Sequence, residues 1–159
     1  MPAKDHHPPK SNRSRADARV PPHDLAAEAA ALGAALLNAD AAAGLPDPAR
    51  FYKPAHQFIA AAIGKLESGT VDVVTVADQL RRDGLLDEVG DLDGLVDLIS
   101  TTPSIGQWPA YARIVNNTWQ LRDIIAAGAA IADLGYSAPD DVAAALARAR
   151  GDLDQITVE

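Results

Sequence analysis

Residues 71–84, VDVVTVADQLRRDG, decide the fold class, because this stretch begins like a β-strand and ends like a helix. Four valines among its first six residues favour a strand. From Val73 to Leu80, however, apolar residues recur at helical spacing. Asp72 and Thr75 are both residue types that cap helix N-termini, and residues 75–78 fit a capping box with an acidic third position.

No other stretch of the chain offers a partner strand of comparable quality. A single strand would leave its backbone N–H and C=O groups without partners, so it would not be stable. Gly84 closes the stretch as a C-terminal glycine closes a helix. We therefore predict a helix with a β-branched first turn and an all-α protein.

Helical patterns also occupy most of the chain around this stretch. We predict helices that begin at Asp24, at Pro54, at Asp91 or Asp93 and near Gln107, and a last helix that is capped by residues 137–140 and ends near Ile156. Residues 38–48 are expected to form a loop, and Ser68-Gly69 to end the helix that begins at Pro54. The long helix from Gln107 is expected to tolerate Pro109 in its first turn and to end at Leu134, before Gly135.

These patterns divide the chain into three parts. Residues 1–23 contain five prolines and few apolar side chains, with five basic residues against two acidic ones, so we predict a disordered basic tail. Residues 24–103 are expected to form a compact globular helical bundle. Residues 104–159 are expected to form a projecting C-terminal helical hairpin.

Composition narrows the function classes. The chain has no cysteine, which excludes disulfides, thiolate catalysis and cysteine zinc sites. No apolar run approaches the roughly 18 residues of a membrane span, and we expect a cytoplasmic protein without membrane contact. Residues 24–159 hold nine basic and 20 acidic side chains, a net charge of −11. Because phosphates repel such a surface, any DNA contact should be indirect or made by the basic tail.

The chain offers no catalytic constellation. The phosphate-binding pattern GxxxxGK[ST] is absent, so nothing indicates nucleotide binding. His6 and His7 lack the further ligands that a metal site needs, and we interpret His56 as a packed or capping residue. Acidic pairs such as Asp87-Glu88 are typical of solvated helix ends. We therefore predict no catalytic residue, no cofactor and no metal.

The hairpin carries the main functional signal. Its last helix has one apolar stripe, which suits a single partner, whereas the long helix is apolar on more than one side. Burying a large aliphatic side chain stabilises by roughly 1.5–3 kcal/mol, so exposing several favours self-association. The alternative is that the body folds back over both sides. The predicted partner surface consists of Trp108, Tyr111, Ile114, Val115, Trp119, Leu121, Ile124, Ile125, Ile131 and Leu146.

Four strings in order, PPHDLAAEAAALGAALL, FYKPAHQFIAAAI, VDVVTVADQLRRDGLLDEVGDLDGLVDL and TPSIGQWPAYARIV, resemble the N-terminal domain of the DnaB-type replicative DNA helicase. The resemblance covers residues 21–156. It implies an all-α bundle followed by a hairpin that pairs between subunits. In that family the paired domains form a collar above a ring of ATPase domains, where primase and helicase loaders dock. Residues 111–115 are similar to the family element that leads into the hairpin.

The chain departs from the family pattern at several positions. Ala26 replaces one of two acids usual in the first helix, and only Glu28 remains. Asp91 replaces a glycine, so it must either adopt a left-handed conformation or cap a helix. Pro109 stands where a helix former is usual. The sequence ends at Glu159, without the RecA-like motor domain of the family, so we expect no ATPase activity from this chain.

Three functions remain open. The first is a non-catalytic interaction and oligomerisation module of the primosome, which forms a dimer or a ring of dimers and docks to helicase, primase or a loader. The second is the N-terminal part of a complete ATP-dependent replicative helicase. The third is a small DNA-binding regulator that uses the tail and residues 72–99. The third is disfavoured because Arg81 and Arg82 stand among seven acids between residues 72 and 93.

Overall fold

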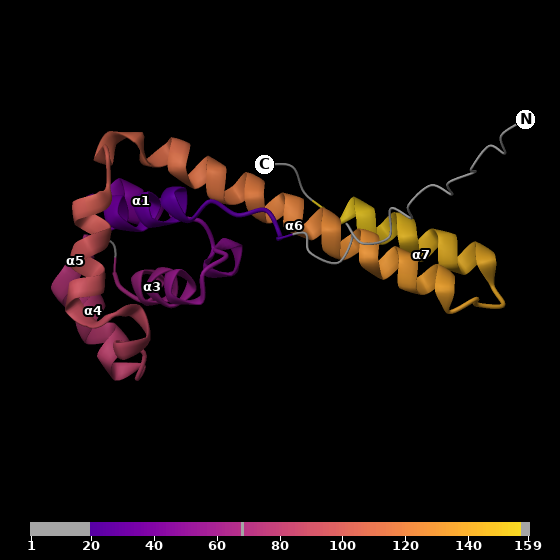
Figure 1. Cartoon of the computed structure of the whole chain (residues 1–159), viewed down its shortest axis with the longest axis horizontal. Helices are drawn as coiled ribbons and strands as arrows, with labels where there is room; N and C mark the ends of the chain where they lie inside the picture. The colour runs from indigo at the N-terminus through magenta and orange to yellow at the C-terminus, as the bar shows by residue number, and fades with distance from the viewer. Residues whose placement is uncertain (1–19, 68, 157–159) are drawn as a thin grey trace, which may run out of the picture.

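A computed structural model describes residues 20–67 and 69–156. Within these ranges the chain forms seven α-helices, with short 3₁₀ turns and no strand, which confirms the all-α prediction. Figure 1 shows a compact body and one long helix, α6 (Trp108–Tyr136), that runs from the body into a projecting hairpin with α7 (Val142–Asp154).

The body packs its helices around α1. Its elements are α1 (Leu25–Ala35), α2 (Ala39–Ala43), η2 (Pro48–Arg50), α3 (Pro54–Gly64), α4 (Val73–Arg82), η3 (Asp87–Val89), α5 (Asp91–Thr101) and η4 (Ile105–Gln107). Helix α1 lies against α3, α5 and the first part of α6. The largest fully buried apolar side chains come from several helices of the body and from α6, and include Leu32, Phe51, Ile59, Leu80 and Val115.

The stretch that decides the fold class is helix α4. Its N-cap is Asp72, whose carboxylate accepts hydrogen bonds of 2.8 Å from the backbone N–H groups of Val74 and Thr75. Thr75 Oγ1 accepts in return from the Asp72 N–H at 3.0 Å, which completes a capping box. The box predicted at residues 75–78 is therefore wrong, because Asp72 starts the helix three residues earlier. Gly84 follows the helix with a φ of 71°, as predicted.

Other helix ends follow local capping. Asp24 caps α1 as predicted and accepts from the Ala27 N–H at 2.9 Å. The loop expected at residues 38–48 is wrong in part, since Asn38 accepts from the Ala41 N–H at 2.9 Å and starts α2 on a run rich in alanine. Pro54 occupies the first turn of α3 as predicted, but α3 ends at Gly64, before Ser68-Gly69. Asp91 takes the left-handed alternative, with a φ of 58°.

The hairpin follows its prediction with shifted boundaries. Pro109 lies in the first turn of α6, where its missing N–H costs nothing. The prediction that α6 ends before Gly135 is wrong, because the helix continues through Gly135 to Tyr136. The predicted cap at residues 137–140 is also wrong: Asp141 caps α7 and accepts from the Ala144 N–H at 2.9 Å. The hairpin proper starts within α6, since the first half of this helix lies along α1 (Figure 1).

Candidate interaction surface

The first half of α6 is part of the body core. Ala112 and Val115 are buried there, and Val115 is 0% exposed within the main hydrophobic cluster. The prediction that Val115 lies on a partner surface is therefore wrong. The sequence shows that this face of α6 is apolar. The body residues that cover the face come from distant parts of the chain, so the spacing within α6 does not reveal the burial.

Three aromatic residues, Trp108, Tyr111 and Trp119, follow the same line along α6 as Val115, and they lie at the junction between α6 and the body. Trp108 is half-buried and its ring lies against Gly44, where an added Cβ would come within 2.3 Å of the ring. Trp119 is half-buried under Arg50, whose guanidinium carbon lies 4.6 Å from the ring centroid. Tyr111 is half-buried as well. For this line the body does fold back over α6, which was the alternative that the sequence left open.

A second apolar line along α6, formed by Ile114, Leu121, Ile124 and Ile125, is not covered by the body. Ile114 is 36% exposed at the start of this line, and the values rise to 48% for Leu121, 51% for Ile124 and 54% for Ile125. On α7, Leu146 is 55% exposed. The structure thus divides the predicted surface residues into a covered set and an exposed set, and the exposed set continues along the hairpin.

Three further exposed apolar residues of the hairpin were missed from the sequence. Tyr136 is 89% exposed, Val142 64% and Leu153 50%. Val142 and Leu153 belong to the stripe of α7 that was assigned to packing against α6, and the hairpin buries this stripe only in part. Apart from Ile114, which lies in the first half of α6, we call these exposed residues together the hairpin surface: Leu121, Ile124, Ile125, Tyr136, Val142, Leu146 and Leu153.

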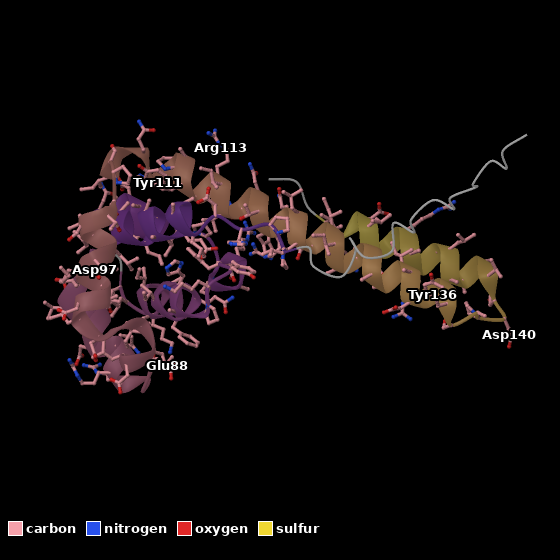
Figure 2. All side chains as sticks on the ribbon, in the orientation of Figure 1. Glu88, Asp97, Tyr111, Arg113, Tyr136 and Asp140 are labelled. Carbon is pink, nitrogen blue, oxygen red and sulfur yellow. The ribbon has the colours of Figure 1, made fainter. Side chains whose placement is uncertain are left out.

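An apolar groove of about 440 Å³ lies between α6 and α7 near the tip of the hairpin. Ile131, which was predicted on the partner surface, lines this groove together with Leu134, Pro139, Val142 and Leu146. Figure 2 shows Tyr136 and Asp140 at the same end of the molecule. The tip therefore presents both a hollow and exposed apolar side chains.

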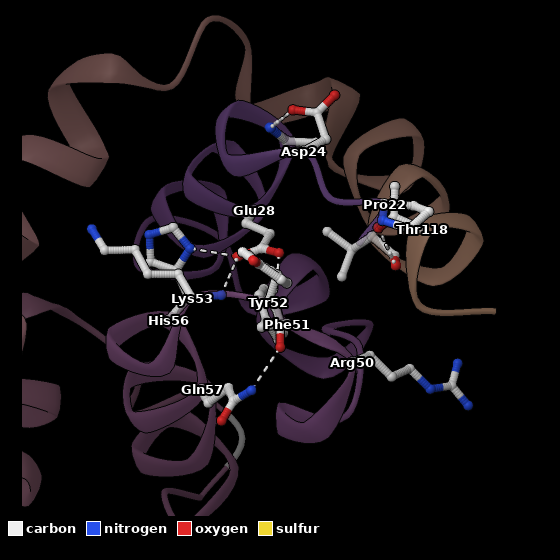
Figure 3. Close-up of polar contacts among 12 residues, drawn as sticks. Pro22, Asp24, Glu28, Arg50, Phe51, Tyr52, Lys53, His56, Gln57 and Thr118 are labelled. Atoms are coloured by element: carbon white, nitrogen blue, oxygen red, sulfur yellow. Dashed lines mark hydrogen bonds and ion pairs between the residues drawn. The ribbon is translucent and has the colours of Figure 1, made fainter. Parts of the chain in front are cut away.

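A buried polar cluster supports the body end of the molecule (Figure 3). Glu28, which is 0% exposed, accepts from the N–H groups of Tyr52 and Lys53 at 2.7 and 3.3 Å and lies 2.7 Å from His56 Nδ1. Burial raises the pKa of Glu28, but the hydrogen bonds from His56, Tyr52 and Lys53 together lower the pKa by more, to below its ordinary value. The carboxylate is ionised and can only accept, so His56 Nδ1 carries the hydrogen.

His56 is thus a packed residue, as the sequence predicted, and is 4% exposed. The role of Glu28 was missed, because its partners lie more than 20 residues away and no local spacing reveals them. The cluster joins α1 to the turn before α3, which makes it a structural support for the body.

Two other kinds of site are absent from the described residues, 20–67 and 69–156. These residues contain no group of three or more side chains arranged to hold a metal ion. None of their helices has the length and apolar character needed to cross a membrane.

Comparison with known proteins gives concordant matches. Residues 20–117 match the family model described as DnaB-like helicase N terminal domain. The chain is 35% identical over 153 residues to the replicative DNA helicase DnaB of Leifsonia xyli subsp. xyli, which covers 93% of this chain. It is 40% identical over 142 residues to the replicative DNA helicase DnaB of Mycobacterium leprae, which covers 85% of this chain.

A solved structure matches as well. The crystal structure of the N-terminal domain of DnaB helicase from Mycobacterium tuberculosis superposes with a TM-score of 0.77 at 39% identity, and the match covers 87% of this chain and 100% of that one. The chain spans only 34% and 24% of the length of the two curated relatives from Leifsonia and M. leprae.

Proposed function

Because the chain belongs to the family of DnaB-like helicase N terminal domains, we propose that it is a non-catalytic module for self-association and protein docking in a replicative helicase assembly. The observation that carries this proposal is the hairpin surface. Leu121, Ile124 and Ile125 are each about half exposed in one copy. Covering such side chains contributes roughly 1.5–3 kcal/mol for each one that becomes fully buried.

The first partner in this proposal is a second copy of the chain. A self-complementary surface pairs the same patch on both subunits, and the hairpin offers exposed apolar residues beside an apolar groove. The module then forms a dimer or a ring of dimers. We propose helicase, primase or a helicase loader as further partners, because the relatives are named as replicative DNA helicases. A cytoplasmic location accords with these partners.

A second candidate function is that of the N-terminal part of a complete ATP-dependent replicative helicase. It is favoured by the observation that the chain spans only 24% to 34% of the length of the relatives from M. leprae and Leifsonia. The module has the same docking role in both cases. Sequencing of the coding region downstream of residue 159 distinguishes them, because a RecA-like domain in the same reading frame would establish the second.

The docking role is tested by placing a charge on the hairpin surface. Ile125→Asp puts a carboxylate into the proposed interface, and we expect it to weaken self-association about tenfold or more, which corresponds to about 1.4 kcal/mol. Val74→Asp is the matched control, since Val74 is 67% exposed on α4 of the body, away from the hairpin. Sedimentation velocity over a concentration series gives both dissociation constants. Equal constants for the two variants would refute the assignment of the hairpin surface.

A further inference from the structure

Arg122 of α6 holds three segments of the chain together where the helix leaves the body. Its Nη1 donates to the carbonyl oxygen of Pro22 at 2.8 Å, and its Nη2 donates to the carbonyl oxygen of Arg50 at 2.6 Å. Its guanidinium carbon lies 5.6 Å from the centroid of the Tyr52 ring. A single side chain therefore links α6 to the segment before α1 and to the turn before α3.

The turn before α3 reaches back to α6. Arg50 donates from Nη1 to Asn116 Oδ1 at 3.0 Å and covers the ring of Trp119. His23, from the segment before α1, stacks on Tyr52 with ring centroids 4.2 Å apart and planes inclined by 12°. Residues 20–24, which we call the strap, thus touch the same ring that Arg122 covers. The predicted tail boundary at residue 23 falls within this strap.

The body side of these contacts is itself fixed. The N–H groups of Tyr52 and Lys53 are bound by the buried carboxylate of Glu28, which belongs to α1. Arg122 therefore binds a turn that is anchored to the centre of the body. Its donors reach carbonyl oxygens that point in a defined direction, so the contact fixes an orientation as well as a distance.

The position of Arg122 along α6 gives this contact a mechanical effect. Val115, seven residues earlier, is the last α6 residue that is fully buried. At 1.5 Å per residue, the part of α6 beyond Val115 is about 31 Å long, and the part beyond Arg122 only about 21 Å. A pivot of about 15° over the shorter length moves the tip by about 5 Å. A contact at Arg122 therefore limits where the hairpin surface points.

We propose that Arg122 is a positioning residue that sets the direction of the hairpin relative to the body and couples that direction to the strap. Arginine suits this task because its planar guanidinium donates in two directions and stacks on a ring at the same time, which the single ammonium of lysine does not. The functional importance of the direction rests on the proposed docking role, since a partner that meets both body and hairpin requires one angle. The direction itself does not depend on self-association.

Pulsed electron–electron resonance between two spin labels measures this direction. The chain contains no cysteine, so Asp97→Cys on α5 and Asp140→Cys at the hairpin tip place one label on each part. Both residues are exposed, and Figure 2 shows them at opposite ends of the molecule. Dilution with unlabelled protein leaves only distances within one chain. Failure of self-association therefore does not affect this measurement.

Three variants are compared with the unchanged protein in the doubly labelled background. Arg122→Gln removes the guanidinium, and we expect a broader distance distribution with a displaced maximum. Arg113→Gln is the matched control, because Arg113 is exposed on the same helix, and we expect it to retain the distribution of the unchanged protein. The third protein lacks residues 1–22 and so lacks the Pro22 carbonyl and part of the strap; we expect it to broaden the distribution too. Circular dichroism checks that each protein keeps its helix content.

The outcomes separate cleanly. Identical distributions for Arg122→Gln and Arg113→Gln would overturn the positioning role of Arg122. Broadening in Arg122→Gln without any change in the truncated protein would overturn the coupling to the strap and leave the positioning role supported. If Arg122→Gln does not fold, Arg122→Lys takes its place, because lysine cannot reproduce the planar contact of the guanidinium. A distribution for Arg122→Lys identical to that of Arg113→Gln would then overturn the positioning role.

Discussion

At the scale of the residue, the buried carboxylate of Glu28 holds together parts of the body that are distant in sequence. It binds two backbone N–H groups of the turn before α3 and the imidazole of His56 within α3. An ionised carboxylate without solvent contact is costly unless its hydrogen bonds are complete, and here they are. Glu28 is also the acid that remains of the two expected from the family pattern, which gives that position a structural reason.

We predict that Glu28→Gln destabilises the protein by about 1.5–3 kcal/mol, because hydrogen bonds to a charged group are lost and the amide NH₂ faces other donors. Urea denaturation followed by circular dichroism measures the free energy of unfolding. Glu88→Gln is the control, since Glu88 is exposed on η3, and its effect should stay within about 0.5 kcal/mol. Equal free energies for the two variants would mean that Glu28 does not support the fold.

The same carboxylate predicts a pH dependence. The folded-state pKa of Glu28 lies below its ordinary value of 4.5, so its contribution to stability is fully present above that value and is lost as the pH falls through the lowered folded-state pKa. The difference in unfolding free energy between the unchanged protein and Glu28→Gln should therefore shrink as the pH falls from about 4.5. Denaturation at a series of pH values measures it. A difference that stays constant down to acidic pH would contradict the ionised, hydrogen-bonded state.

At the scale of the element, the close approach of α1 and α5 depends on Gly33, a glycine in the last turn of α1. A Cβ on Gly33 would lie 2.3 Å from the carbonyl oxygen of Leu98 and 2.0 Å from Thr102 Oγ1. The carbonyl belongs to the backbone of α5, so it cannot move aside without the helix. Gly33 therefore sets the distance between the two helices, although glycine lowers helix propensity.

We predict that Gly33→Ala destabilises by about 1–3 kcal/mol, because the added methyl group forces α1 and α5 apart. Gly64→Ala is the matched control, since no atom lies within 4 Å of the site where its Cβ would be placed and Gly64 is helical. The control should be neutral or stabilise the protein by up to about 1 kcal/mol. Thermal unfolding followed by circular dichroism compares the two. A Gly33→Ala variant as stable as the control would show that the helices can separate freely.

The sequence predicted elements well where the signal is local. Asp24, Pro54 and Gly84 act at α1, α3 and α4 through backbone groups within a few residues, so their roles can be inferred from spacing alone. The short helix α2 was missed, because Gly44 and the prolines after it outweighed the Asn38 cap in the interpretation. Where two neighbouring residues can both cap a helix, as Asp72 and Thr75 can at α4, the sequence alone leaves the first residue of the helix ambiguous.

The partner surface was predicted less completely, and the reason is again distance along the chain. The sequence identified α6 as apolar on two sides, but Val115 is covered by the body core and Trp119 by Arg50, which lies 69 positions earlier. No periodicity within α6 contains that information. On α7 the apolar stripe was identified, but the sequence does not show that α6 covers only part of it. The exposure of Val142 and Leu153 was therefore missed.

At the scale of the whole molecule, the fold separates the hydrophobic core from the surface that we propose for docking. The core lies in the body and in the first half of α6, which contributes the buried residues Ala112 and Val115, whereas the second half of α6 and α7 contain no buried residue. The hairpin instead exposes apolar side chains along both helices. Under our proposals, such a module binds its partners at the hairpin while the body stays folded, and the contacts of Arg122 with the body set where the hairpin points.

We propose above all that this hairpin surface is covered by another copy of the chain. Light scattering coupled to size-exclusion chromatography measures it directly, as the mass of the unmodified protein over a concentration series. We predict a mass of at least twice the 16.6 kDa of one chain at tens of micromolar, decreasing on dilution and on substitution of Ile125 by aspartate. A constant mass of 16.6 kDa across the whole series would contradict the claim.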